Sequence, residues 1–125
     1  MKNIITPENL VTNGSMASNI TSNVLSTQMV DDIGIQLDWT GSPVGTVAIQ
    51  VSLNYSVNPD GSVRNAGTWA TLPTSAFSGT YPVPGTTTSP GFLDIPLTSA
   101  TAIRVVYTAS SGSGTLNVVA VAKGV

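Results

Sequence analysis

The sequence predicts an all-β protein: a two-sheet antiparallel β-sandwich, jelly-roll-like, with about 6–8 short strands and an extended N-terminal arm. Apolar and polar residues alternate over 33–39, 47–55 and 93–97, and residues 103–107 and 116–122 carry an apolar side chain at every second position. A period of two indicates strands with a buried face. Clusters of Gly, Pro and Ser separate these runs and supply the turns. No stretch carries the apolar spacing of a long helix.

Residues 1–16 are predicted to form the arm, and residues 17–125 a single domain. Thr6 is a candidate N-cap and Pro7 a candidate first residue of one helical turn that ends at Gly14. A turn this short is unstable by itself. Its apolar side chains therefore need a surface, either the domain itself or a neighbouring subunit, and the arm residues predicted to contact it are Ile4, Ile5, Leu10 and Val11.

The longest alternating stretch covers residues 32–56 and is predicted to form a hairpin, preceded by one or two short strands within 17–30. Residues 40–45, TGSPVG, supply the chain reversal. The side chains expected to face the core are Ile33, Ile35, Leu37 and Trp39 in the first strand, and Val47, Ile49, Val51, Leu53 and Tyr55 in the second.

The remainder of the chain is predicted as a turn, a short strand, a long loop and three strands. Pro59-Asp60-Gly61 has the composition of a tight turn, and residues 68–72 form the short strand. Residues 73–91 hold four of the eight prolines, and a loop of this length is often functional or packed on a partner. Its residues predicted to contact a partner are Tyr81, Pro82 and Pro84.

The last three strands are predicted at residues 92–97, 102–108 and 115–122. Pro96 indicates that the first of them is an edge strand or that the strand ends there, because proline cannot donate to a strand ladder. The last is apolar on both faces, which is typical of a central or covered strand. The inward side chains are expected to be Leu93, Ile95, Leu97, Ile103, Val105, Tyr107, Leu116, Val118, Ala120 and Ala122.

Composition limits the classes of function. Only 8% of the 125 residues are charged and the net charge is −2, which argues against a nucleic-acid surface. Ser and Thr occupy 32 positions; such a surface suits close packing in an assembly, although threonine is also common in β-proteins. Neither a secretory leader nor a membrane-spanning segment is predicted, so the chain is expected to stay in a cytoplasm or to leave it by another route.

The residue types give little support to catalysis. The chain has no His and no Cys, which excludes a histidine-based triad and a typical zinc site. We expect no enzyme, metal or cofactor; a carboxylate pair and a calcium site stay as weaker alternatives. The acidic candidates are Asp31, Asp32, Asp38, Asp60 and Asp94, the last of which is placed beside Arg104 for an exposed ion pair.

Aromatic residues raise an alternative of another class, a carbohydrate-binding, lectin-like module. Trp39, Tyr55 and Tyr107 share their faces with Ile, Leu and Val and are therefore assigned to the core. Tyr81 and Trp69 are left to stack against a sugar.

Four stretches resemble small β-sandwich accessory proteins of tailed bacteriophage virions, of the head-decoration, head-fibre or neck-tail type. They are IGIQLDWTGSPVGT at 33–46, TWATL at 68–72, IRVVYT at 103–108 and SGSGTL at 111–116. Residues 73–91 are longer and richer in Pro and Thr than the resemblance implies.

This resemblance implies a non-enzymatic structural protein of the virion. Such a protein binds a capsid or connector surface, self-associates into a homo-oligomer and is assembled in the host cytoplasm. Its partners are other virion structural proteins, and it contacts neither nucleic acid nor membrane.

Overall fold

The computed structural model describes residues 3–4, 7–26, 32–73, 81–86, 89–96 and 102–124. These residues form strands and loops and contain no helix. The strands are β1 (Asn3–Ile4), β2 (Glu8–Ser15), β3 (Ile20–Thr21), β4 (Leu25–Ser26), β5 (Asp32–Gly41), β6 (Val44–Ser52), β7 (Ser56–Val57), β8 (Val63–Asn65), β9 (Ala70–Thr71), β10 (Gly91–Pro96), β11 (Ala102–Ser111) and β12 (Gly114–Gly124).

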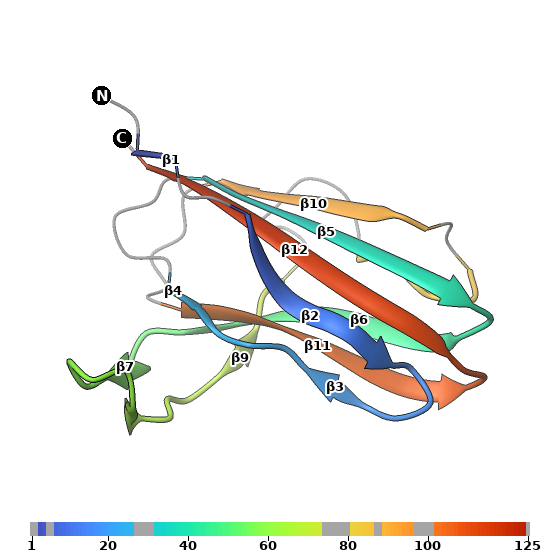
Figure 1. Ribbon diagram of the computed structural model, residues 1–125, viewed down its shortest axis with the longest axis horizontal. Helices are drawn as coiled ribbons and strands as arrows, with labels where there is room; N and C mark the ends of the chain where they lie inside the picture. The colour runs from blue at the N-terminus through green and yellow to red at the C-terminus, as the bar shows by residue number, and fades with distance from the viewer. Residues whose placement is uncertain are drawn as a thin grey trace.

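The strands make two facing antiparallel sheets and one small ribbon (Figure 1). In the first sheet β12 and β5 are central, β10 is at one edge, and β1 and β2 share the other side of β12. In the second sheet β11 and β6 are central, β9 is at one edge, and β3 and β4 share the other side of β11. Strands β7 and β8 pair only with each other. The predicted all-β sandwich is confirmed, and several of its strands are only two residues long.

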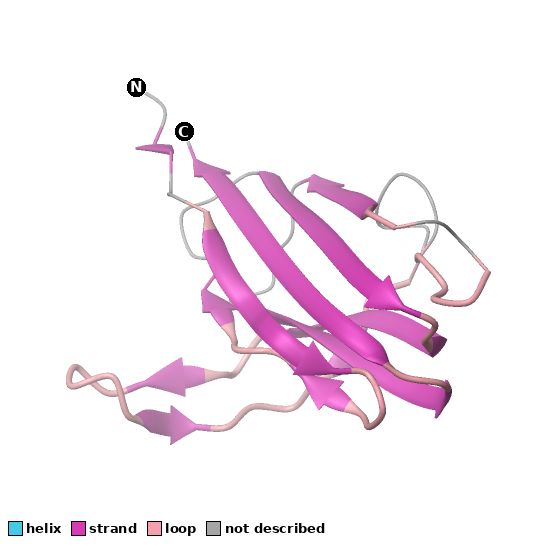
Figure 2. Cartoon of the chain, turned by 45° about the vertical axis from the view of Figure 1, so that its right-hand side comes forward, coloured by secondary structure: helices cyan, strands magenta, loops and turns pink. Residues whose placement is uncertain are grey.

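The chain repeatedly crosses between the two sheets (Figures 1 and 2). The predicted hairpin at 32–56 is wrong, because its two strands lie in different sheets. Strand β5 pairs with β12 and β10, whereas β6 pairs with β11 and β9. The turn between β5 and β6 is therefore an arch from one sheet to the other. The alternation of apolar and polar residues shows which face of a strand is buried but does not show which strand it pairs with. A hairpin within one sheet and an arch between two sheets therefore have the same pattern.

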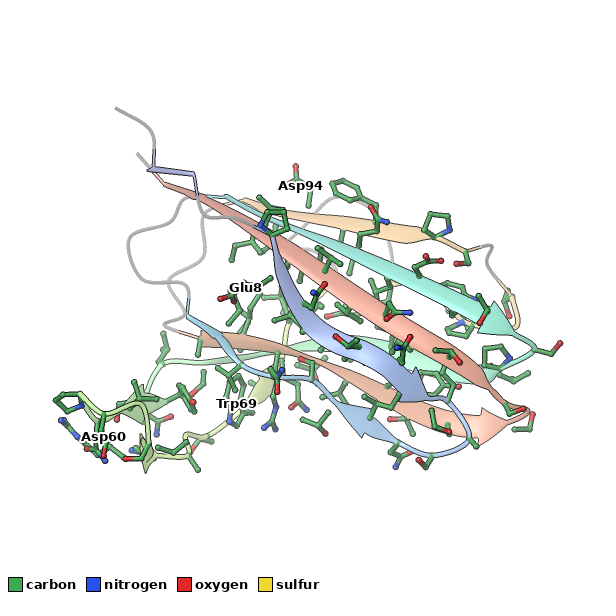
Figure 3. The ribbon with its side chains drawn as sticks, viewed as in Figure 1. Glu8, Asp60, Trp69 and Asp94 are labelled. Carbon is green, nitrogen blue, oxygen red and sulfur yellow. The ribbon has the colours of Figure 1, made fainter. Side chains whose placement is uncertain are left out.

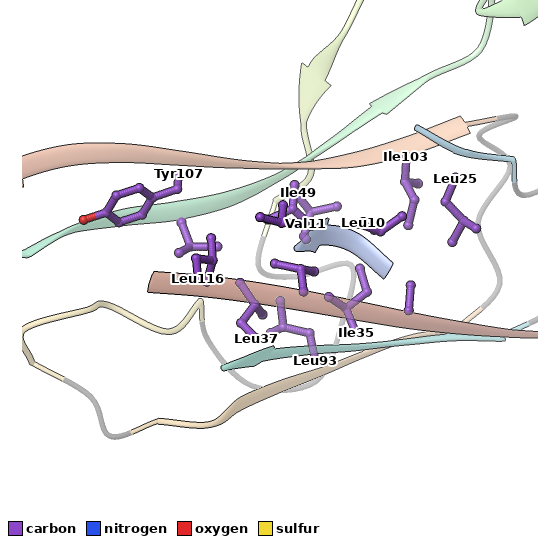
Figure 4. Packing of buried hydrophobic residues seen from close by; sticks show 14 of the residues in the cluster. Leu10, Val11, Leu25, Ile35, Leu37, Ile49, Leu93, Ile103, Tyr107 and Leu116 are labelled. Atoms are coloured by element: carbon purple, nitrogen blue, oxygen red, sulfur yellow. The ribbon is translucent and has the colours of Figure 1, made fainter. Parts of the chain in front are cut away.

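The core lies between the sheets, and Figure 4 shows its packing. The predicted inward residues of β5, β10, β11 and β12 are buried wherever the structure describes their side chains; those of Leu97 and Ala122 lie outside the description. In β6, Val47 and Ile49 are buried and Val51 is partly buried. Beyond the end of β6 the prediction is wrong: Leu53 is 69% exposed, and Tyr55 is only half-buried.

The region predicted as an arm contributes a full strand to the first sheet. Glu8 begins β2, which pairs with β12, so the predicted helical turn is wrong at this point. The β2–β12 register shifts between Val118 and Val119, and such a bulge lets the neighbouring residues Leu10 and Val11 both turn into the core. Their exposed fractions are 3% and 8%.

Three arches stack at one end of the sandwich, at the right of Figure 1: 16–19 between β2 and β3, 42–43 between β5 and β6, and 112–113 between β11 and β12. The Met16 N–H donates to the Gly114 carbonyl at 2.9 Å, and the Ser42 N–H donates to the Ser113 carbonyl at 3.0 Å. Gly112 has a φ of 75°, which favours glycine. These contacts close the end of the sandwich.

Candidate functional site

The Tyr81 ring, predicted to be free for a sugar, is engaged inside the protein. Its hydroxyl donates to the Leu72 carbonyl and lies 3.5 Å from the Ile49 carbonyl, and its ring packs against the core. Burial raises the pKa of the Tyr81 phenol. Trp39 and Tyr107 are core residues as predicted, with exposed fractions of 8% and 0%.

The other predicted contact residues are placed as follows. Pro82 and Pro84 are buried, and the Pro84 carbonyl accepts a hydrogen bond of 3.2 Å from the Gly45 N–H. Leu10 and Val11 are buried in the core. Burial within the chain removes all four side chains from the surface that a partner can reach. The Ile4 side chain and the whole of Ile5 lie outside the described residues.

A groove of about 640 Å³ lies at the arch end, between the β5–β6 arch and the residues Gly85, Thr86 and Ser89. Both flanking segments were predicted as turns or loops, but no feature of the sequence shows that they meet. The groove is lined by hydroxyl-bearing, glycine and apolar residues and by no charged residue: Trp39, Gly41, Ser42, Pro43, Val44, Gly85, Thr86 and Ser89.

Hydrogen bonds fix one wall of this arch groove. The Trp39 backbone N–H donates to the Ser89 hydroxyl oxygen at 2.9 Å, and that hydroxyl donates to Asp38 Oδ1 at 2.9 Å. Asp38, one of the acidic candidates, is exposed on β5. The side chain of Ser89 is thus held in place by two neighbouring residues of β5.

A second feature is the β7–β8 ribbon, which projects at the opposite end of the molecule (Figure 1). The predicted Pro-Asp-Gly turn is confirmed at its tip, where Gly61 has a φ of 92° and its N–H donates to the Asn58 carbonyl at 2.9 Å. The Ser62 hydroxyl and N–H both donate to Asp60 Oδ1. These hydrogen bonds hold the pKa of the Asp60 carboxyl below its usual value.

An aromatic cluster joins the base of the ribbon to the second sheet, and Figure 3 shows the position of its member Trp69. The rings of Tyr55 and Trp69 are 5.7 Å apart at 55°, and the Arg104 guanidinium lies 4.2 Å from the centre of the Trp69 ring. The Trp69 indole N–H donates to the Ala66 carbonyl at 2.8 Å. Tyr55 therefore belongs to this cluster and not to the core. Trp69, predicted to be available for stacking against a sugar, is engaged by Tyr55, Arg104 and the Ala66 carbonyl.

The predicted Asp94–Arg104 pair is wrong. Asp94 is on β10 of the first sheet, and Arg104 is on β11 of the second. Their side chains alternate with buried neighbours, so they lie on the outer faces of opposite sheets. Arg104 instead donates from Nε to Gln50 Oε1 at 2.8 Å.

Among the residues that the structure describes, large apolar side chains are exposed in three places. Leu53, Val57 and Val63 lie on or beside the ribbon, with exposed fractions of 69%, 46% and 54%. Phe92 is 67% exposed on the edge strand β10, where its ring lies over Gly34. Val44, at the rim of the arch groove, is 42% exposed.

In the described part of the chain, no three acidic side chains are grouped so that they could hold a metal ion. Nor does that part contain a helix with the length and apolar character needed to cross a bilayer. The side chains of Asp31 and Asp32 are outside the description.

Comparisons with known proteins bear on the fold. Neither a protein family nor a curated protein matches the sequence. Among solved structures, the SPBc2 prophage-derived protein YomS is similar, with a TM-score of 0.54 and 11% sequence identity. The likeness covers 97% of this chain and 95% of that one. At this identity it shows a shared fold over nearly the whole of both chains.

Proposed function

We propose that this protein is a non-enzymatic structural component of a bacteriophage particle, assembled in the host cytoplasm, which self-associates and binds a capsid or connector surface. The observation that carries the proposal is the likeness of the whole chain to a prophage-derived protein. Because that likeness extends over 97% of the chain, it concerns the complete sandwich and its arches rather than a shared fragment.

The character of the surface supports the same proposal. Only 8% of the residues are charged, so neighbouring copies repel one another weakly at long range. Phe92 exposes 67% of its surface on an edge strand, and exposed aromatic residues are enriched at protein interfaces. A protein with this surface is suited to standing in close contact with other protein subunits.

The ribbon is the strongest candidate for the contact. A two-stranded ribbon is marginally stable alone, but this one is anchored at its base, where Ser52, 2% exposed, donates from its hydroxyl to Asn54 Oδ1 at 3.0 Å. The same Asn54 oxygen accepts from the Thr68 N–H at 2.7 Å. The anchored ribbon presents Val57 and Val63 without a need to reorganise them, which lowers the entropic cost of binding.

Two experiments test the proposal. Peptide mass spectrometry of purified particles, from a phage that encodes the chain, should detect it in fixed proportion to the major capsid protein. Its absence from intact particles, with the chain present in the lysate, would refute the virion assignment.

The second experiment measures assembly. Native mass spectrometry of the purified chain should give an oligomer of defined size, which Val57→Asn with Val63→Asn should weaken. Thr71→Asn, an exposed position on β9, is the matched control. An unchanged oligomer in the ribbon variant would exclude the ribbon as the self-contact, and a monomeric wild type would refute self-association.

A further inference from the structure

We propose that the arch groove binds a neutral saccharide, an activity that goes beyond the proposed structural role. The ligand class follows from the indole of Trp39, for which the described residues supply no acceptor, from the hydroxyl groups and apolar surface around it, and from the absence of charged side chains among the described lining residues. The β5–β6 arch, whose residues line the groove, lies at the opposite end of the molecule from the ribbon (Figure 1).

The buried donor is the indole N–H of Trp39. This side chain lines the groove and is 8% exposed, yet within the described residues no acceptor bonds its indole nitrogen. The other tryptophan, Trp69, donates to a backbone carbonyl. A buried tryptophan N–H normally finds a partner, and leaving one unpaired is unfavourable. An acceptor supplied by a ligand would satisfy it.

The chemistry of the lining selects the ligand. Ser42, Thr86 and Ser89 bring hydroxyl groups to the groove, and Pro43 and Val44 bring apolar surface. The described lining holds no cationic side chain, so it offers nothing to balance a phosphate or a carboxylate group. A sugar ring matches this mixture, since it presents hydroxyl groups that donate and accept beside C–H faces that are apolar.

A peptide is a less suitable occupant. Peptides bind sheets mainly by adding a strand to an open edge. Near the groove β5 and β6 are not flanked by β10 and β9, which pair only as far as Leu37 and from Gln50 onward. The edge N–H groups there are already bonded, that of Trp39 to the Ser89 hydroxyl and that of Gly45 to the Pro84 carbonyl. These groups are therefore taken before a peptide strand could pair with them, and recognition depends on side chains and turn backbone.

The groove is held in shape before any ligand arrives. Ser89 is fixed by Asp38 and by the Trp39 backbone. Across the groove Gly85, at a φ of 96°, packs so closely on Val44 that a Cβ at residue 85 would lie 3.0 Å from a Val44 methyl carbon. A preformed site loses little conformational entropy on binding.

The chain offers a direct assay. It has two tryptophans, so Trp69→Phe leaves Trp39 as the only indole and makes the fluorescence report on the groove. The full-length variant is titrated with maltohexaose, cellohexaose and chitohexaose, and separately with an uncharged Gly/Ser/Pro peptide. We expect saturable quenching or a wavelength shift with at least one oligosaccharide, at concentrations up to about 10 mM.

Two variants assign the binding to named groups. Thr86→Val should weaken saccharide binding about tenfold, the effect of one lost hydrogen bond, whereas Thr71→Val, which removes an exposed hydroxyl on β9, should not. Trp39→Phe, followed by isothermal calorimetry, should weaken binding to a similar degree. Absence of any saccharide response, a response to the peptide alone, or equal affinity in Trp39→Phe would each overturn the proposal.

Discussion

The packing of the arches can be tested with three Gly→Ala substitutions that separate backbone strain from steric overlap. Gly61, at the tip of the ribbon, has a φ of 92° and no atom within 4 Å of the Cβ that alanine would add. At Gly114 the added Cβ would lie 2.1 Å from the Thr40 carbonyl oxygen, and its φ is not positive. Gly112 combines a φ of 75° with a Cβ position 2.1 Å from the Ser42 carbonyl oxygen.

The expected losses follow from these geometries. Gly61→Ala should cost about 1–2 kcal/mol of unfolding free energy, the penalty of a left-handed backbone for an L-residue. Gly114→Ala should cost about 1–3 kcal/mol, because the neighbouring arch has to move to relieve the overlap. Gly112→Ala carries both penalties and should cost about 2–5 kcal/mol, a large part of the stability of a domain.

Urea unfolding followed by tryptophan fluorescence and by circular dichroism measures the three free energies, with the slope of the transition showing whether it remains two-state. The ranking is the decisive result: Gly112→Ala should be less stable than either of the other variants. If Gly112→Ala proves as stable as Gly61→Ala, the close contact between the arches does not exist in solution. If Gly112→Ala does not fold, the Gly114→Ala and Gly61→Ala values still test the two contributions.

Three further predictions concern single side chains. Leu10→Ala should cost about 2–5 kcal/mol of stability because Leu10 is a core residue, whereas Leu53→Ala should change it by less than about 0.5 kcal/mol; similar values in urea unfolding would argue against a buried β2. Tyr81→Phe should cost about 0.5–1.5 kcal/mol and leave saccharide affinity unchanged by calorimetry. The carboxyl of Asp60 should titrate by NMR below its usual pKa, and Ser62→Ala should raise that pKa. The Asp60–Ser62 hydrogen bonds therefore stabilise the ribbon at higher pH, and their contribution is lost as the pH falls through the lowered pKa of Asp60.

The layers of the fold could be predicted from the sequence because burial has a local signature. Ile33, Ile35 and Leu37 alternate with polar residues, and all three are buried. A period of two reports the orientation of each side chain relative to the core. Pro96 likewise indicated an edge, and β10 is the edge strand of the first sheet.

Which strands pair, and which distant residues lie together, could not be predicted from the sequence in the same way. The pattern at 32–56 is identical for a hairpin and for an arch, so no local feature of the sequence shows that β5 and β6 lie in different sheets. Leu10 and Val11 looked unpaired because a bulge places two consecutive side chains inward, and alternation has no signal for a bulge. Ser42 and Ser89 line the same groove although they are far apart in the sequence. Only the tertiary fold brings them together.

The stacked arches link stability to the proposed site. Ser42, whose carbonyl lies against Gly112, also lines the groove, so strain introduced at Gly112 should reach the groove directly. The ribbon is anchored separately, through Ser52, Asn54 and Trp69 at the other end of the molecule. Sites more than about 7–10 Å apart without shared partners usually behave additively. A destabilised arch should therefore weaken saccharide binding before it weakens contacts made by the ribbon, which makes the two proposed activities separable in one protein.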